Sequence, residues 1–227
     1  MGSRQTVFIV HTSFVSLRDL AELWQEFAPE VQVRNIVDDS LLPEVLAHGG
    51  VTPGVRSRMI EYYKAAETAG ADLIFNQCSS VGEVANLAAQ LVRVPVIKVD
   101  ERMAQVACDL GTHIGVVATL ETTLGPTCRL IEAKAREAER TMHIERRLVE
   151  GAFETLIAGD RPKHNAMVLD AIRELCRTAD AVVCAQGSMM AIVPDLGETS
   201  IPVLTSPRMG VEYAADFLRG LATNPHG

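Results

Sequence analysis

The sequence predicts an α/β fold of two pseudo-symmetric lobes, each a mostly parallel sheet flanked by helices. The first observation is a repeat, since residues 70–80 read GADLIFNQCSS and residues 178–188 read TADAVVCAQGS. Two further pairs recur in the same order: Val-Pro-Val at 94–96 with Ile-Pro-Val at 201–203, and VFIVHT at 7–12 with IGVVAT at 114–119. The second observation is that short apolar runs alternate with helical periodicity, which is typical of βαβ units and parallel sheets.

The apolar runs predict the strands. Strands that are buried on both faces read as continuous runs rich in Val and Ile. On this basis we expect strands at residues 7–10, 31–36, 73–75, 96–99, 114–118, 142–148, 181–184 and 203–205.

Helical periodicity and end signals predict the helices between these strands. A Pro or Gly follows three of them, and Ser79 and Ser80 precede a fourth, where their hydroxyls can cap the first amides. We expect helices at residues 17–28, 54–69, 81–91, 101–110, 126–140, 162–178 and 208–221.

The boundary between the lobes is predicted near Asp100. No Gly/Ser/Pro-rich segment is present, so we expect the two halves to be joined without a flexible linker. The last helix follows Ile-Pro-Val as the helix at 101 follows Val-Pro-Val, and we expect it to pack back on the first half. The first lobe is therefore residues 1–99 plus 206–227, and the second is residues 100–205. Ligands of open α/β sheets bind at the carboxyl ends of strands, so a cleft between the lobes is expected to collect the loops at Thr12, Cys78, Thr119 and Gln186.

Composition excludes several classes of function. The chain has 227 residues, 48% of them hydrophobic and 22% charged, and a net charge of −8, whereas a nucleic-acid partner would require a basic surface. No apolar run reaches the length of about 18 residues that a membrane span needs, and no signal peptide is recognisable. Five widely spaced cysteines indicate the reducing cytoplasm. No metal motif, dinucleotide fingerprint, phosphate loop or serine elbow is present, so we expect no metal and no cofactor.

Cys78 is the first candidate for a catalytic residue. It stands where an apolar strand ends and a helix is expected to begin. The partial positive charge of a helix N-terminus lowers a thiol pKa below its usual value of about 8.5 and favours the thiolate. Asn76, Gln77, Ser79 and Ser80 are its polar neighbours. The alternative is a buried core cysteine, which is common in proteins.

Small polar residues at the other strand ends are candidates for substrate binding. Backbone amides at Ser79, Ser80, Gly187 and Ser188 are suited to an anion, although these residues also suit plain helix capping. The hydroxyls of Thr12, Ser13, Thr119 and Thr122 can donate to a carboxylate. His11 is either an acid–base group or a structural histidine, and Cys184 is interpreted as a core residue.

The chain resembles the aspartate/glutamate/hydantoin racemase superfamily, which includes maleate isomerase and arylmalonate decarboxylase. The resemblance rests on GADLIFNQCSS, on IGVVAT followed by ETT, on TADAVVCAQGSM and on IPVLTSP. It implies two lobes with the active site between them, no cofactor, and a small carboxylate held by small residues and amides. It also implies two thiols flanking the substrate carbon, of which Cys78 is the first. A homo-oligomer is expected on the same ground.

The second thiol position falls on Gln186, whose amide cannot exchange a proton at neutral pH but can donate hydrogen bonds to an oxyanion. Three functions stay open. The first is a racemase or isomerase in which Cys184, His11 or water acts as the acid or base on the second face of the substrate carbon. The second is a single-cysteine decarboxylase or cis-trans isomerase in which Gln186, Ser188 and Thr119 stabilise the charge. The third is a non-catalytic binder of a small carboxylate. The identity of the substrate is not predicted.

Overall fold

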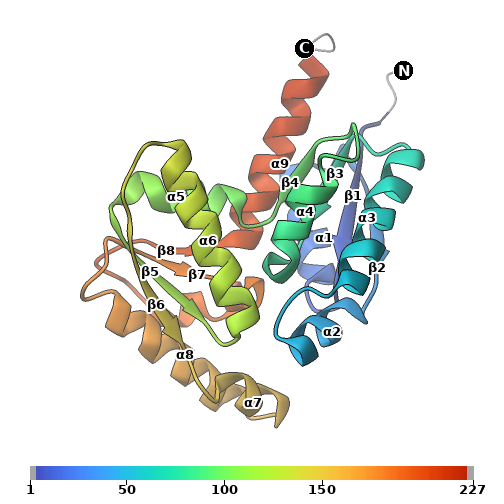
Figure 1. The fold of residues 1–227 in the computed structure, drawn as a ribbon. Coiled ribbons are helices and arrows are strands. Elements are labelled where there is room, and N and C mark those ends of the chain that lie inside the picture. The colour runs from blue at the N-terminus through green and yellow to red at the C-terminus, as the bar shows by residue number, and fades with distance from the viewer. Residues whose placement is uncertain (1–3, 224–227) are drawn as a thin grey trace. The chain divides into compact units, whose positions relative to one another are not determined.

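The computed structural model describes residues 4–223 and divides the chain into two compact units. The first unit is Met1–Val99 with Pro207–Gly227, and the second is Asp100–Ser206. In the described residues each unit holds a four-stranded parallel sheet with helices on both faces (Figure 1). The predicted α/β class with two similar halves is therefore confirmed. Residues 1–3 and 224–227, which the predicted first lobe includes, lie outside the described residues.

The first sheet has the strand order β2-β1-β3-β4. Its central strands are paired in parallel from Val7↔Leu73 to Val10↔Asn76, so their carboxyl ends lie at one edge. The elements of this unit are β1 (Thr6–His11), α1 (Leu17–Phe27), β2 (Gln32–Val37), α2 (Leu41–His48), α3 (Pro53–Thr68), β3 (Leu73–Asn76), η1 (Ser79–Val81), α4 (Gly82–Ala88), β4 (Val96–Lys98) and α9 (Ser206–Thr223).

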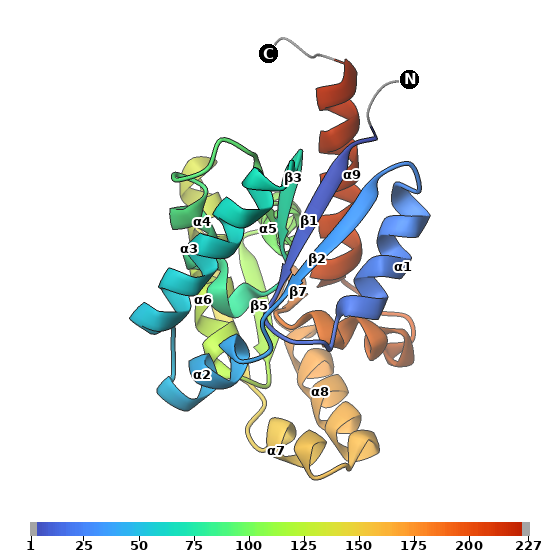
Figure 2. The same cartoon turned by 90° about the vertical axis from the view of Figure 1, so that its right-hand side faces the viewer.

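Helices cover both faces of the first sheet (Figure 2). On one face α2, α3 and α4 pack on Val10 and Ile74, with Met59 and Tyr63 fully buried. On the other face lie α1 and α9, and Trp24 of α1 meets the Phe75 ring edge-on at 5.9 Å. Helices therefore cover both faces of β1 and β3, which explains the uninterrupted apolar sequences of these strands.

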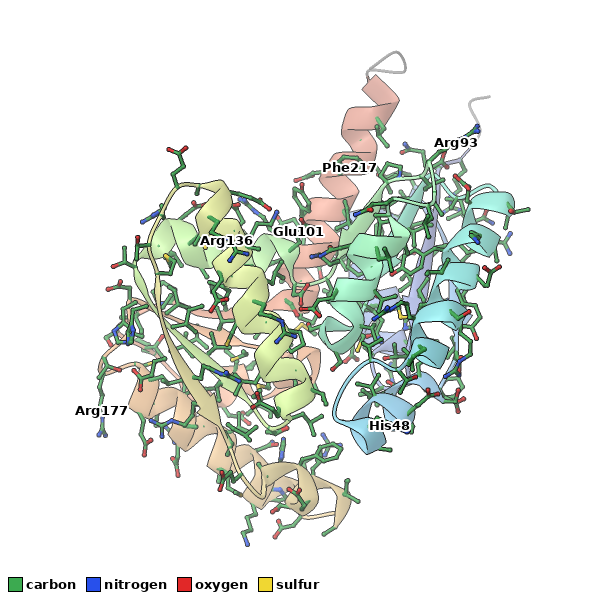
Figure 3. The ribbon with its side chains drawn as sticks, viewed as in Figure 1. His48, Arg93, Glu101, Arg136, Arg177 and Phe217 are labelled. Carbon is green, nitrogen blue, oxygen red and sulfur yellow. The ribbon has the colours of Figure 1, made fainter. Side chains whose placement is uncertain are left out.

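The second sheet repeats this topology in the order β6-β5-β7-β8. Helix α8 packs on one face through Leu175 and Ile172, and α5 and α6 lie together on the other (Figure 2). Glu101 opens α5 (Figure 3). Its carboxylate is paired with the ammonium group of Lys134 on α6 at 2.9 Å. The elements are α5 (Glu101–Leu110), β5 (His113–Ala118), α6 (Glu121–Glu137), β6 (His143–Leu148), α7 (Ala152–Ile157), α8 (Arg161–Leu175), β7 (Ala181–Cys184), η2 (Gly187–Ala191), η3 (Val193–Leu196) and β8 (Val203–Thr205).

The repeated Ala-Asp pairs fasten the amino ends of the sheets. The Asp72 carboxylate accepts the backbone N–H of Thr6 at 2.7 Å. The Asp180 carboxylate accepts those of Thr112 at 2.8 Å and His113 at 2.9 Å. These amide donors lower the pKa of Asp180, because they stabilise its charged form. Both aspartates therefore lie at the opposite end of their strands from the candidate site.

Some predicted boundaries are wrong. The helix predicted at 126–140 begins at Glu121 and carries Pro126 inside it, so Pro126 does not mark its start. The short helices α2 and α7 were not predicted. The helix predicted directly after Ser80 begins at Gly82, behind the 3₁₀ turn η1. Ser79 and Ser80 lie within that turn, and neither is an N-cap.

The close approach of α9 to β4 depends on Gly210. A Cβ atom at this position would lie 2.2 Å from the carbonyl oxygen of Val99, which is rigid backbone. We expect Gly210→Ala to lower the free energy of unfolding by about 1–3 kcal/mol, because the helix must move off the strand end. Gly220→Ala, on the same helix with no atom near the added methyl, is the control and is expected to be neutral or slightly stabilising. Urea denaturation measures both, and equal midpoints would contradict the steric explanation.

Across residues 4–223, no helix has the length and apolar character needed to cross a bilayer. In the same residues, no group of three His, Cys, Asp or Glu side chains is arranged to hold a metal ion.

Candidate active site

Cys78 lies at the carboxyl edge of the first sheet. It follows β3 by two residues, its backbone is extended, and its side chain is half-buried. The backbone N–H of Val81 donates to the Cys78 carbonyl at 3.3 Å and closes the turn that follows. The thiol also packs against the cluster formed by α2, α3 and α4. It is therefore held at the strand end without being sealed in the core.

A buried hydrogen-bond chain positions the Cys78 backbone. The Tyr63 hydroxyl donates to the side-chain carbonyl of Asn76 at 3.1 Å, and the Asn76 amide donates to the Cys78 carbonyl at 3.0 Å. Tyr63 and Asn76 are both fully buried. Burial, followed by the charge of Cys78, raises the pKa of Tyr63, so its hydroxyl stays protonated and donates. Each end of the Asn76 amide thus makes one hydrogen bond within the protein, and together these bonds hold the Cys78 backbone; Asn76, which the sequence also predicts as a substrate-binding residue, keeps a second N–H.

The loop after β1 is joined to the loop after β3 by Gln77. Its amide donates to the Thr12 hydroxyl at 3.3 Å, and its carbonyl accepts from the Ser16 hydroxyl at 2.7 Å. Thr12 is buried and Ser13 is half-buried. The predicted binding residues Thr12, Ser13, Ser79 and Ser80 therefore lie in the two adjoining loops that flank Cys78. Sequence reasoning missed Gln77 as the link between these loops.

His11 is the last residue of β1 and is fully buried. Its Nε2 lies 2.9 Å from the side-chain oxygen of Asn35 on β2, and its Nδ1 is buried without a hydrogen-bond partner. Burial lowers the pKa of His11 and outweighs the opposing effect of Asn35. The imidazole is therefore neutral at pH 7. Strand alternation places its side chain on the opposite face of the sheet from Asn76.

Gln186 occupies the corresponding position at the carboxyl edge of the second sheet. Its side-chain oxygen accepts from the Thr119 backbone N–H at 2.6 Å and from the Thr119 hydroxyl at 3.0 Å. These two donors fix which end of the amide carries the oxygen. The amide NH₂ consequently points away from Thr119 as a donor, which suits a negatively charged ligand group.

The other predicted residues of the second unit are spread over two elements. Gly187 and Ser188 begin η2, where Gly187 is half-buried and Ser188 is exposed. Thr122 lies in the first turn of α6, and its buried hydroxyl has no hydrogen-bond partner. We had expected Thr122 in a loop after the strand; because α6 starts earlier, it belongs to the helix instead.

The remaining four thiols are poor nucleophiles. Burial raises the pKa of Cys108 and Cys176, that of Cys128 to about 11 and that of Cys184 to about 12. Cys184 lies in the core cluster under α8, as the sequence predicts.

Because the thiolate is the reactive species, we expect iodoacetamide near pH 8 to alkylate Cys78 before the other cysteines. A time course of peptide masses measures the order of labelling. Earlier labelling of Cys176, the other half-buried thiol, would contradict the prediction.

The family model described as Asp/Glu/Hydantoin racemase matches residues 7–214. Glutamate racemase RacE1 from Bacillus anthracis has a similar fold, with a TM-score of 0.72 and 16% identity over 96% of this chain and 83% of that one. Aspartate racemase from Picrophilus torridus gives 0.70 and 14% over 95% and 94%.

Allantoin racemase from Klebsiella pneumoniae gives a TM-score of 0.66 and 17% identity over 98% of this chain and 91% of that one. A comparison with curated protein sequences found no match. At such identities the solved structures show a shared fold, and the family model covers most of the sequence. The chain belongs to the Asp/Glu/hydantoin racemase family.

Proposed function

We propose that this protein is a cofactor-independent racemase or isomerase of a small carboxylic acid, with Cys78 as the thiol that moves the α-proton. The main support is the half-buried thiol of Cys78 at the carboxyl end of β3. The hydrogen bonds of Tyr63 and Asn76 hold the Cys78 backbone between two loops of small polar residues. Membership of the family supports the reaction class. Because the five cysteines are free, the proposal places the enzyme in the reducing cytoplasm.

The proposed reaction begins with the Cys78 thiolate. It takes the proton from the carbon beside the carboxylate, and the electron pair of the broken C–H bond moves onto the carboxylate oxygens. The proposal assigns Gln186 to the same reaction, where its amide NH₂ donates to that growing charge. Thr119 holds the amide in the required orientation. Ser188 and the amide of Gly187 are assigned to the same carboxylate, as are Thr12, Ser13, Ser79, Ser80 and Thr122.

The possible reactions differ in which group donates a proton to the face of the substrate carbon opposite Cys78. Cys184 is unsuited, because it is fully buried and its pKa is about 12. His11 is neutral at pH 7 and bonded to Asn35, which leaves water as the simplest donor. Water delivered to the second face gives inversion, whereas return of the proton from Cys78 gives retention.

The oriented Gln186 amide favours a second candidate function. A single thiol together with an oriented amide donor suits decarboxylation or cis-trans isomerisation, in which Cys78 would act as nucleophile or proton donor and Gln186, Ser188 and Thr119 would stabilise the charged intermediate. In decarboxylation the C–C bond to CO₂ breaks, its electron pair stays on the substrate, and the Cys78 thiol donates the proton that completes the product.

Incubation in deuterated water tests the proposal. A panel of amino acids, hydantoins and substituted malonates is followed by NMR and by polarimetry. Deuterium at the α-carbon with inversion supports racemisation, exchange with retention supports one-sided proton transfer, and loss of CO₂ supports decarboxylation. A ligand that raises the melting temperature while no acid in the panel exchanges or turns over would show a carboxylate binder and refute the enzyme proposal.

A further inference from the structure

The most exposed large apolar side chains lie at the carboxyl edges of the two sheets. Among the described residues, Val15, Ile157 and Phe14 are exposed by 74%, 70% and 64%, and the next, Leu91, by 52%. Phe14 and Val15 follow β1, and Ile157 is the last residue of α7, which follows β6. Apolar surface that gathers beside polar candidate residues is typical of a ligand-binding site.

Helix α7 starts at the edge that carries the candidate residues of the second unit. The backbone N–H of Val149 donates to the carbonyl of Ala118, at the end of β5, at 2.8 Å. Ala152, the first residue of α7, is fully buried in the same core cluster as Met189 of η2. Because η2 begins directly after Gln186, the first turn of α7 shares its core with the loop of the candidate site.

The rest of α7 is not buried. The His164 side chain of α8 fastens the start of the helix, where its Nδ1 donates to the Ala152 carbonyl at 2.8 Å. Phe153 and Leu156 are half-buried, and the helical spacing groups them with the exposed Ile157. These three residues form an apolar stripe, which we call the α7 stripe.

The equivalent helix of the first unit is fastened more firmly. Helix α2 follows β2 as α7 follows β6, and two of its apolar side chains are fully buried. Its Glu44 is also paired with Arg58 of α3. In contrast, α7 has one buried residue and lies between Gly151 and Gly159, whose φ angles are 74° and 89°. Small residues of this kind suit hinges, so the helix can adjust to a ligand.

The composition of α7 defines a class of substrate. Its single charged residue is the acid Glu154, so a second carboxylate on the substrate would meet no cation on this helix. An alkyl or aryl group would instead remove both itself and the α7 stripe from water, which is favourable. We propose that α7 binds the substituent of the substrate, and that the acid carries an alkyl or aryl group beside its carboxylate. This inference rests on the proposed function, which supplies the carboxylate site.

A second copy of the chain is the alternative occupant of the α7 stripe. A stable protein interface buries about 800 Å² on each partner and uses roughly 20–30 residues a side. The α7 stripe offers three side chains on a helix of six residues. Its size therefore fits a small molecule better than a subunit.

The test compares three acids that differ in the group on the α-carbon, which is hydrogen in acetate, carboxymethyl in succinate and phenyl in phenylacetate. NMR titration measures the dissociation constant of each. The native protein is expected to bind phenylacetate about tenfold more tightly than succinate, because only the phenyl group can cover the stripe. Phenylacetate binding that is absent, or no tighter than that of succinate, would overturn the proposal with no variant needed.

Ile157→Asn removes the most exposed part of the stripe at a position where the fold is not at risk. We expect it to weaken phenylacetate binding about fivefold and to leave acetate binding unchanged. Leu110→Asn is the matched control, because Leu110 is an exposed leucine of the same unit that ends α5, ahead of the amino end of β5. It is expected to bind all three acids as the native protein does.

An unchanged preference for phenylacetate in Ile157→Asn would overturn the proposal. If that variant instead lowered the particle mass in light scattering and kept the preference, the stripe would belong to a second copy, which overturns the proposal as well.

The inference and the proposed reaction fail separately. A preference for phenylacetate that depends on Ile157, with no deuterium exchange on any acid, would retain the apolar subsite and refute the reaction. Exchange that depends on Cys78 but is faster on succinate than on phenylacetate, together with tighter binding of succinate, would retain the reaction and refute the subsite.

Discussion

Cys78→Ser is expected to lower the rate of α-proton exchange by about 10²–10⁴-fold, the usual contribution of a positioned acid–base group. The serine hydroxyl has nearly the size of the thiol and leaves the Tyr63–Asn76 chain in place, because that chain ends on the backbone carbonyl. Its proton, however, is far too weakly acidic to leave near neutral pH. The loss should therefore appear in turnover, with the melting temperature and carboxylate binding nearly unchanged. Exchange in deuterated water, measured by NMR, provides the rate.

Cys176→Ser is the control for this prediction. Cys176 is also half-buried, but it lies at the end of α8, where burial raises its pKa. We expect it to exchange at the native rate. Full turnover in Cys78→Ser would remove the thiol from the mechanism, and equal losses in both variants would point to general damage by cysteine replacement.

Gln186→Glu is expected to lower turnover by about 10²–10³-fold, the range measured for loss of one donor to a developing oxyanion. The new carboxylate can still accept both hydrogen bonds from Thr119, so the side chain keeps its place. Its second oxygen replaces the amide NH₂ and offers a negative charge where the proposal places a donor. The substrate carboxylate is then repelled, and KM should rise together with the loss of kcat.

The pH dependence of Gln186→Glu separates this role from a structural one. Protonation of the introduced carboxyl restores a donor, so part of the lost activity should return as the pH falls from 7 towards 5. Gln186→Met keeps the length of the side chain and removes both polar ends, and it should show no such recovery. The proposal for Gln186 would not survive a Glu variant that binds and turns over the acid as well as the native protein at pH 7.

The repeat predicted much of the fold because strand ends and turns are encoded locally. The runs at Ala181–Cys184 and Val203–Thr205 match the observed strands. The first is buried throughout, as its unbroken apolar sequence predicts, and the second is half-buried at the edge of its sheet. The start of α6 was misplaced because Pro favours the first helical turn, and Pro126 instead stands inside a helix that opens at Glu121. There the tertiary packing of the buried Leu124 and Cys128 outweighs the local signal.

The side-chain contacts of the candidate site were less accessible to sequence reasoning. Cys78 and Gln186 stood out because the repeat compares them directly. Thr119 was also named from the sequence, but the hydrogen bonds of Tyr63 and Thr119 could not be predicted, because they join elements that only the fold brings together.

The contribution of α9 to the first unit has a consequence for the order of biogenesis. Gln5 donates to the carbonyl of Leu218, and Arg208 pairs with Glu26, so early and late parts of the chain complete one core. The ribosome synthesises Asp100–Ser206 before α9. The second unit can therefore finish folding while the first unit still lacks its last helix. Until then Glu26 and Phe27 of α1 lack their contacts with Arg208 of α9, and a nascent chain stalled near residue 200 would be a natural client for a chaperone.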